Sequence, residues 1–205
     1  MAGPGSYRSL QLARHLPQFG YEPVILTIDE ADIANGYYPY DHTLLSADDH
    51  FEILRVPTGE PVRLKKLLSK AKLFRLAWLL LYPLLWESSA LWPFRAFRVA
   101  KRYIRDHDVQ LVYTSSGPYS SLLLGYLLKR FLRVRWVADL RDPFTDAYAW
   151  RWPSKAHWYA CRFAERIVLR QPDKLVVNTP AVRDLYIRRG LIDADRVHVI
   201  TNGFS

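Results

Sequence analysis

RWVADLRDPFTD, residues 135–146, joins a short apolar run to a charged turn. The run Trp136-Val137-Ala138 is typical of a strand that is buried on both faces of a parallel sheet. We expect this strand to end where the charges begin, at Asp139, Arg141 and Asp142. Open α/β sheets bind ligands beyond the carboxyl ends of their strands, so these three side chains are candidate substrate-binding residues. A salt bridge from Arg141 to one of the two aspartates is the alternative interpretation.

The composition indicates a globular protein of one or two domains, with 205 residues of which 50% are hydrophobic and 24% charged. A single cysteine, Cys161, excludes a disulfide framework and favours a reducing cytoplasm. The first ten residues carry no apolar segment preceded by positive charge, so no secretion signal is visible. The net charge of +9 suggests an anionic partner such as nucleic acid, acidic lipid or a phosphorylated substrate.

Apolar runs alternate with helical patterns along the chain. Strands are predicted at 23–28, 51–56, 109–113, 136–138, 175–178 and 197–200, and helices at 7–19, 62–82, 93–107, 118–131, 153–170 and 180–189. This alternation predicts the α/β class, with a Rossmann-like doubly wound parallel sheet and helices on both faces. Residues 29–50 are polar and predict a long surface loop. Polar residues near the strand ends should gather along one edge of the sheet: Ser115, Arg141, Asn178 and Asn202.

Residues 62–105 form a basic, apolar helical insert with eleven Lys or Arg against one acid, Glu87. One interpretation is a core helix with a solvated basic edge. The other is a helix lying on an anionic membrane surface, with lysines beside an apolar stripe and tryptophans at the interface. The apolar run is shorter than the ~20 residues of a membrane span, and Pro83 interrupts it. In the membrane interpretation these residues face the lipid: Lys65, Lys66, Lys70, Lys72, Trp78 and Trp86, with Tyr82 and Trp92 as further anchors.

Two loops rich in small residues precede predicted helices. Gly3-Pro4-Gly5-Ser6 is expected to be a turn in which Ser6 caps the next helix. Thr114-Ser115-Ser116-Gly117-Pro118 is expected to open another helix. Such loops can present backbone N–H groups to an anion, although capping the helix alone is the alternative. The candidate substrate-binding residues here are Gly3, Gly5, Ser6, Ser115 and Ser116, and Asn178 is a further candidate after a later strand.

Six motifs follow one another along the chain: GPGSYR at 3–8, FGYEPV at 19–24, VYTSSGP at 112–118, VADLRDPF at 137–144, VVNTP at 176–180 and ITNGF at 200–204. In their order and spacing they resemble the N-terminal domain of a family-4-like glycosyltransferase of the GT-B fold. The resemblance spans nearly all of the chain, and residues 29–90 match least.

The resemblance implies a Rossmann-like, mainly acceptor-binding domain at 1–200 and the start of an interdomain hinge at 201–205. It implies an enzyme that transfers a sugar, of the hexosyltransferase type, from a nucleotide-sugar donor to a hydroxyl acceptor. In relatives the loop matching 3–6 approaches the donor phosphates, and the segment matching 139–141 lies beside the transferred sugar. Arg141 is therefore carried over as a cleft residue. Positive groups would offset charge on the departing diphosphate.

The resemblance also implies that no metal and no cofactor is needed, and no His, Cys or Asp cluster has metal-ligand spacing. The basic, tryptophan-rich segment suggests a lipid-linked or polysaccharide acceptor in cell-surface glycan synthesis. We therefore expect a cytoplasmic protein that is peripheral on the inner face of the membrane. Two pieces of the family pattern are missing from the sequence: the strand before the glycine turn, and the donor domain. We accordingly expect a fragment that is inactive on its own.

Two other classes of protein compete with this interpretation. A dinucleotide-binding Rossmann module would use Gly3-Pro4-Gly5 as part of a GxGxxG turn, but Arg8 stands in place of the third glycine and no strand precedes the turn. A nucleic-acid-binding protein would use the positive charge, but no recognised binding motif is present. The charge is also interleaved with an apolar stripe that suits lipid better, so nucleic acid is not the expected partner.

Overall fold

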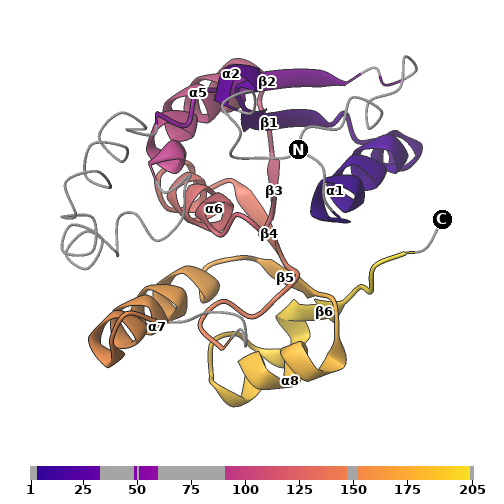
Figure 1. The fold of residues 1–205 in the computed structure, drawn as a ribbon. Coiled ribbons are helices and arrows are strands. Elements are labelled where there is room, and N and C mark those ends of the chain that lie inside the picture. The colour runs from indigo at the N-terminus through magenta and orange to yellow at the C-terminus, as the bar shows by residue number, and fades with distance from the viewer. Residues whose placement is uncertain (1–3, 33–48, 50, 60–90, 147–151, 204–205) are drawn as a thin grey trace, which may run out of the picture.

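The structure, a computed structural model, describes residues 4–32, 49, 51–59, 91–146 and 152–203, with side chains from Tyr7 onward. Helices and strands alternate along it (Figure 1). The first part holds α1 (Pro4–His15), the 3-10 helix η1 (Leu16–Phe19), β1 (Val24–Ile28), the short α2 (Glu30–Asp32), β2 (Glu52–Val56) and α5 (Trp92–Asp106). The second part holds β3 (Leu111–Ser115), α6 (Ser120–Leu132), β4 (Arg135–Leu140), α7 (Lys155–Leu169), β5 (Lys174–Val177), α8 (Pro180–Arg188), η3 (Ala194–Arg196) and β6 (Val197–Val199).

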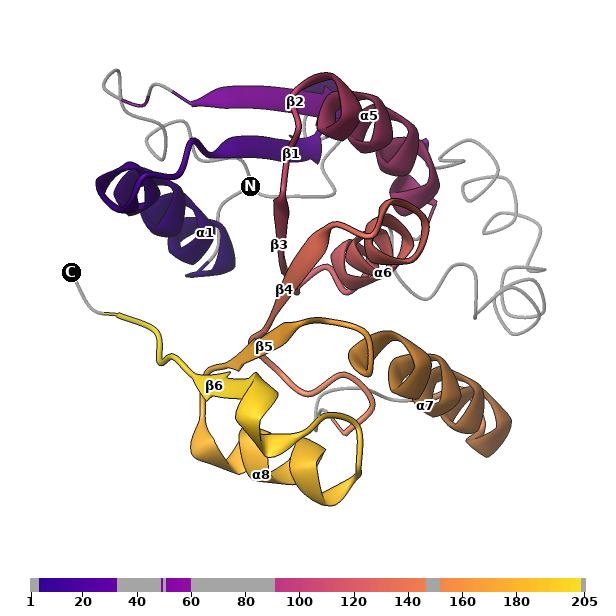
Figure 2. The ribbon, with the colours of Figure 1, turned by 180° about the vertical axis from the view of Figure 1, so that it is seen from behind.

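The strands form two parallel sheets. One contains β1 and β2, and the other has the order β3-β4-β5-β6. Helices α5, α6 and α7 lie on one side of the larger sheet, and α1 lies on the other side (Figures 1 and 2). The α/β class with parallel strands and flanking helices is confirmed, and the arrangement is Rossmann-like.

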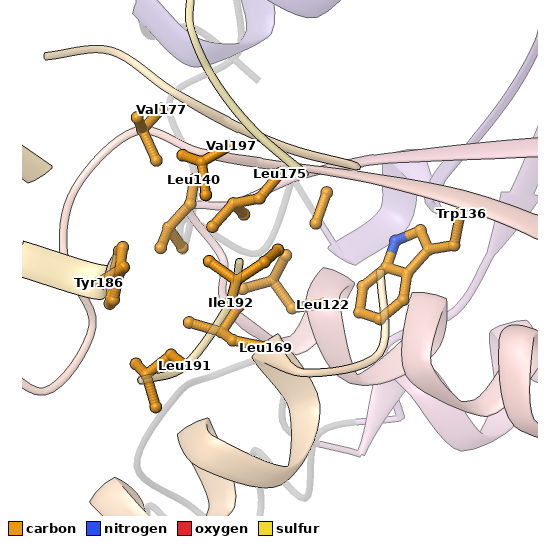
Figure 3. Close-up of a cluster of buried hydrophobic side chains, with 11 residues drawn as sticks. Leu122, Trp136, Leu140, Leu169, Leu175, Val177, Tyr186, Leu191, Ile192 and Val197 are labelled. Atoms are coloured by element: carbon orange, nitrogen blue, oxygen red, sulfur yellow. The ribbon is translucent and has the colours of Figure 1, made fainter. Parts of the chain in front are cut away.

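The larger hydrophobic core lies where β4, β5 and β6 meet their helices (Figure 3). Trp136, Leu140, Leu175 and Val177 from the strands are fully buried, together with Tyr186 of α8. Each Å² of apolar surface removed from water stabilises the folded state by about 25 cal/mol. Strands buried on both faces therefore consist of continuous apolar runs. The core therefore holds the carboxyl ends of the strands in fixed positions.

A second core joins the two sheets through their helices. Ile28 and Val56, the last residues of β1 and β2, pack in one cluster with Trp92 and Ala96 of α5 and with Leu124 of α6. Trp92 is buried, and its indole Nε1 donates to the carbonyl of Val56 over 3.1 Å. The expectation that Trp92 anchors the protein in a membrane is therefore wrong, because this side chain belongs to the core.

The helix ends follow local rules. Gly20 ends η1 with a left-handed φ of 80°, as predicted, and its N–H donates to the carbonyls of Leu16 and Pro17. The prediction that Ser6 caps the first helix is wrong, because α1 already begins at Pro4. Proline favours the first turn of a helix, where its missing N–H leaves no intrahelical bond unmade.

The basic insert is described only in part. Its end is α5, while the predicted helix at 62–82 lies outside the described residues. Within the described chain, no helix is both long and apolar enough to cross a bilayer.

Candidate functional site at the carboxyl edge of the sheet

The ends of the four parallel strands meet along one edge. In register, Ser115 pairs with Asp139, Leu140 with Val177, and Val177 with Val199. The loops that leave these ends therefore begin side by side, as expected from parallel pairing. They contain four of the nine predicted substrate-binding residues: Ser116, Arg141, Asp142 and Asn178.

Asp139 lies inside β4 rather than beyond it, which corrects the predicted strand end. Its side chain is 0% exposed and accepts two hydrogen bonds from Arg8 of α1, from Nε over 2.9 Å and from Nη2 over 3.2 Å. A buried carboxylate needs such a charged, bidentate partner to remain in a strand. Arg8 also donates to the carbonyl of Thr201 over 3.1 Å and to Asn202 Oδ1 over 3.3 Å. One guanidinium thus connects α1, β4 and the segment after β6.

Two hydroxyl groups from β3 complete the surroundings of Asp139. Tyr113 donates to Oδ2 over 2.5 Å, and Ser115 donates to the same oxygen over 3.2 Å. Burial and the charge of Asp139 raise the pKa of Tyr113 well above its ordinary value, so the phenol stays protonated and remains a donor. Four hydrogen bonds therefore satisfy Asp139 within the protein. It acts as a buried anchor beneath the edge and does not present a free carboxylate to a substrate.

Arg141 is held against the loop that follows β3. Its Nε donates to the carbonyl of Ser116 over 2.8 Å, its Nη2 to the carbonyl of Gly117 over 3.2 Å, and its backbone N–H to Ser116 Oγ over 3.1 Å. Gly117 has a φ of +90°, and a Cβ there would lie 2.2 Å from Arg141 Nη2. The guanidinium remains partly exposed. No described acid forms a salt bridge with Arg141, so the alternative interpretation, an ion pair with Asp139 or Asp142, is not found there.

The two remaining candidates on this edge differ in their surroundings. Asp142 is exposed just beyond β4. Asn178 is partly buried after β5, and its buried Oδ1 accepts no hydrogen bond from any described group. An unsatisfied buried acceptor costs about 1–3 kcal/mol, so a donor supplied by a ligand would remove a real penalty. Next to it, Thr179 Oγ1 accepts from the N–H of Val182 and caps α8.

A buried polar network fixes the loop after β4. Glu165 of α7 accepts from Thr145 Oγ1 over 2.5 Å, from Arg189 Nη2 over 2.7 Å and from the Tyr186 hydroxyl over 3.3 Å. Arg189 also pairs with Asp146 over 2.6 Å. These contacts tie the loop to α7 and α8. They thereby set the position of Asp142, the exposed acid earlier in the same loop.

The structure brings only part of the predicted set together. Ser115, Ser116, Asp139, Arg141, Asp142 and Asn178 lie at the carboxyl edge, with Ser116 and Asp139 buried. Gly5 and Ser6 lie in the first turn of α1, whereas Gly3 lies outside the described residues. The proposed membrane-facing residues also lie outside: Lys65, Lys66, Lys70, Lys72, Trp78 and Trp86. The described residues contain no group of His, Cys, Asp or Glu that could hold a metal ion.

Sequence reasoning missed the residues that organise the edge. Arg8 stands out in the sequence only as part of the GPGSYR motif and as a departure from a GxGxxG turn, and its partner Asp139 is 131 positions away. Glu165 and Arg189 are likewise separated by a strand and a helix. A single charged residue on an otherwise apolar helix face can indicate a buried ion pair. It does not show which distant residue carries the opposite charge.

A hollow of about 540 Å³ lies at the opposite end of the sheet, between the ends of α5 and α6. Three arginines line it. Arg105 and Arg133 stand at the carboxyl ends of helices, where positive charge is favourable without any ligand, and Arg135 begins β4. The helix ends therefore explain two of the three positive charges.

The family comparison agrees with the fold. A family model described as a glycosyl transferase 4-like domain matches residues 3–203, which is almost the whole chain. No curated protein sequence shows a match.

Proposed function

Because the chain belongs to the glycosyl transferase 4-like family, we propose that it is the acceptor-side domain of an enzyme that transfers a hexose from a nucleotide-sugar to a hydroxyl group. The family match over residues 3–203 is the observation that carries this proposal. The proposed acceptor is lipid-linked or a growing polysaccharide in cell-surface glycan synthesis. The net charge of +9 supports a protein that works at the anionic inner face of a membrane.

The residues of the carboxyl edge have distinct roles in this proposal. Asn178 Oδ1 accepts a hydrogen bond from an acceptor hydroxyl, and Asp142 is free to accept a second one. Arg141, held by two carbonyls, offsets negative charge that develops on the departing diphosphate. Arg8 and Asp139 position the turn of α1 relative to the hinge at Thr201 and Asn202. The donor is held by a second domain, so the chain alone is proposed to be inactive.

The test joins the chain at Gly203 to the donor-binding domain of a family relative. Transfer of radiolabelled hexose from UDP- and GDP-linked donors is then measured with a polyprenyl-phosphate-linked acceptor in vesicles. We expect transfer by the fusion and none by the chain alone or by the donor domain alone. Transfer by the chain alone would refute its assignment as one half of the site. Cofactor-dependent oxidation or reduction without sugar transfer would favour the dinucleotide-binding alternative.

Arg141→Ala tests the role of the edge. We expect kcat of the fusion to fall about 100-fold, the usual loss when a group that stabilises developing negative charge is removed. The cost in folding should stay near 1 kcal/mol for each lost hydrogen bond. Arg183→Ala on the exposed surface of α8 is the control. If the folded fraction of the Arg141 variant keeps normal turnover, Arg141 only supports the loop.

A further inference from the structure

Helix α7 carries an apolar stripe on its outward face. Tyr159 is 63% exposed, Phe163 67% and Ile167 40%, and they follow one another at four-residue spacing. Residues four apart lie on one side of a helix, so the three side chains form a continuous row. Ala156 and Ala160, both exposed, extend it. A single exposed apolar residue needs no explanation, but a row over two turns of a helix does.

The charge beside this stripe has one sign. Lys155 and Arg166 are exposed on α7, and Arg170 is exposed at its carboxyl end. The helix contains one acid, Glu165, which is buried in the network at the carboxyl edge of the sheet. The exposed charges of α7 itself are therefore all cationic and border an apolar centre. The nearby acid Asp146 is paired with Arg162 of α7 over 3.0 Å.

The same pattern continues over the neighbouring helices. Helices α5, α6 and α7 lie on one side of the sheet (Figures 1 and 2), and together they contain ten Lys or Arg but only two acids, Asp106 and Glu165. Asp106 pairs with Arg102 of its own helix. Phe94 of α5 and Phe131 of α6 are exposed on these helices as well. An apolar surface bordered by cations matches a bilayer with anionic headgroups.

We propose that the outward face of α7 is a docking surface for an anionic lipid bilayer, with Tyr159, Phe163 and Ile167 entering the headgroup boundary. Lys155, Arg166 and Arg170 then meet the lipid phosphates. This inference rests on the membrane association in the proposed function and is independent of sugar transfer. A second copy of the chain does not fit this face, because a symmetric contact would bring the same cations together.

Flotation with vesicles tests the proposal directly. The 205-residue chain should float with vesicles of phosphatidylcholine and phosphatidylserine, and much less with pure phosphatidylcholine. The double variant Tyr159→Ser/Phe163→Ser should lower the partition coefficient about tenfold or more, because two large apolar groups no longer enter the boundary. Phe19→Ser, at an exposed aromatic of η1, is the matched control and should float normally. Arg166→Glu should weaken flotation more than Arg188→Glu, the same charge change on α8.

A fluorescent label provides a second measurement that does not depend on removing apolar groups. A cysteine introduced as Ala156→Cys on α7 can be labelled selectively, because the natural Cys161 is buried. An environment-sensitive dye at this position should shift to the blue with anionic vesicles. The same dye at Ala181→Cys on α8 should not shift.

Each alternative outcome identifies a different error. Normal flotation of the double variant, with no shift at Ala156→Cys, would place membrane binding elsewhere in the chain and overturn the role of α7. Equal flotation with neutral vesicles would show that binding does not depend on anionic headgroups and would refute the role of the cations. No flotation of the unmodified chain would refute membrane association as a whole and leave the glycosyltransferase assignment intact. Salt-sensitive binding of RNA without vesicle binding would overturn the lipid proposal in favour of nucleic acid as the anionic partner.

Discussion

Asp139 and Arg8 form an ion pair that lies almost entirely inside the protein. The aspartate is completely buried and the arginine is 14% exposed, so the protein shields both charges from water. Loss of one partner leaves the other charge buried and alone, which is more damaging than loss of both. The pair therefore constrains which substitutions the edge of the sheet tolerates.

Arg8→Ala should lower the free energy of unfolding by about 3 kcal/mol or more, as for other broken buried pairs. Chemical denaturation measured by circular dichroism would detect the change. Arg183→Ala, which removes an exposed arginine from α8, should cost far less. The double variant Arg8→Gln/Asp139→Asn should recover much of the loss, because two neutral groups replace the unpaired charge. If Arg8→Ala costs no more than Arg183→Ala, Arg8 does not stabilise the fold.

Cys161 should be an unreactive thiol in the folded protein. Burial, with a further contribution from the charge of Glu165, raises its pKa to about 11. The thiol is therefore neutral at every pH well below that value, and the thiolate is the reactive form. At pH 8 a thiol reagent should modify the native chain slowly and the denatured chain rapidly. The rate should rise as the pH approaches 11, and fast modification of native protein at pH 8 would contradict the burial of this side chain.

The sequence predicts the class of fold because buried parallel strands must be apolar. Trp136-Val137-Ala138 and Leu175-Val176-Val177 lie in strands that pair with each other, as expected. The same reasoning predicts the end of β4 at Ala138, two residues before its actual end at Leu140, because a charged residue such as Asp139 usually leaves a buried strand. It stays there only because Arg8, distant in the sequence, neutralises it. Local patterns therefore predict elements well, but they predict a site poorly when its partners come from distant segments.

Helix α6 packs against β4 at one unusually close point. An added Cβ on Gly125 would lie 2.3 Å from the indole of Trp136, which is fully buried and donates to Thr114 Oγ1 over 2.9 Å. Glycine within a helix normally lowers stability by about 1 kcal/mol relative to alanine. Here the contact between helix and strand outweighs that preference, so the glycine sets how close α6 can come to the sheet.

Gly125→Ala should therefore destabilise the protein despite its better helix propensity, by about 1–3 kcal/mol as in other overpacked cores. Thermal unfolding followed at 222 nm would measure the change. Combining it with Trp136→Phe, which removes part of the indole, should make the added methyl group less costly than it is with Trp136 present. An increase in melting temperature for Gly125→Ala alone would show that the helix can move away from the strand freely.

The division of the strands into two sheets is the main feature of the whole fold. β2 and β1 form one sheet and β3 to β6 the other, so β1 and β3 are both edge strands of the described chain. In a doubly wound sheet the central strand lies where the strand order reverses, which is the junction between these two edges. Helices α5 and α6 bridge this junction through the second core, where Ile28 and Val56 meet Leu124 and Leu128.

A strand supplied at this junction should join the two sheets into one. Extending the chain before Met1 by about six apolar, β-branched residues, the usual length of a strand, places such a segment next to the turn of α1. Each newly paired backbone group contributes about 1 kcal/mol net, so the melting temperature should rise by about 5 °C or more and the transition should sharpen. An extension of the same length with alternating Ser and Gly is the control and should have no effect. An unchanged transition with the apolar extension would show that the junction does not accept a strand. In that case the packing of α5 and α6 would hold β1 and β3 apart, and no strand would be missing between them.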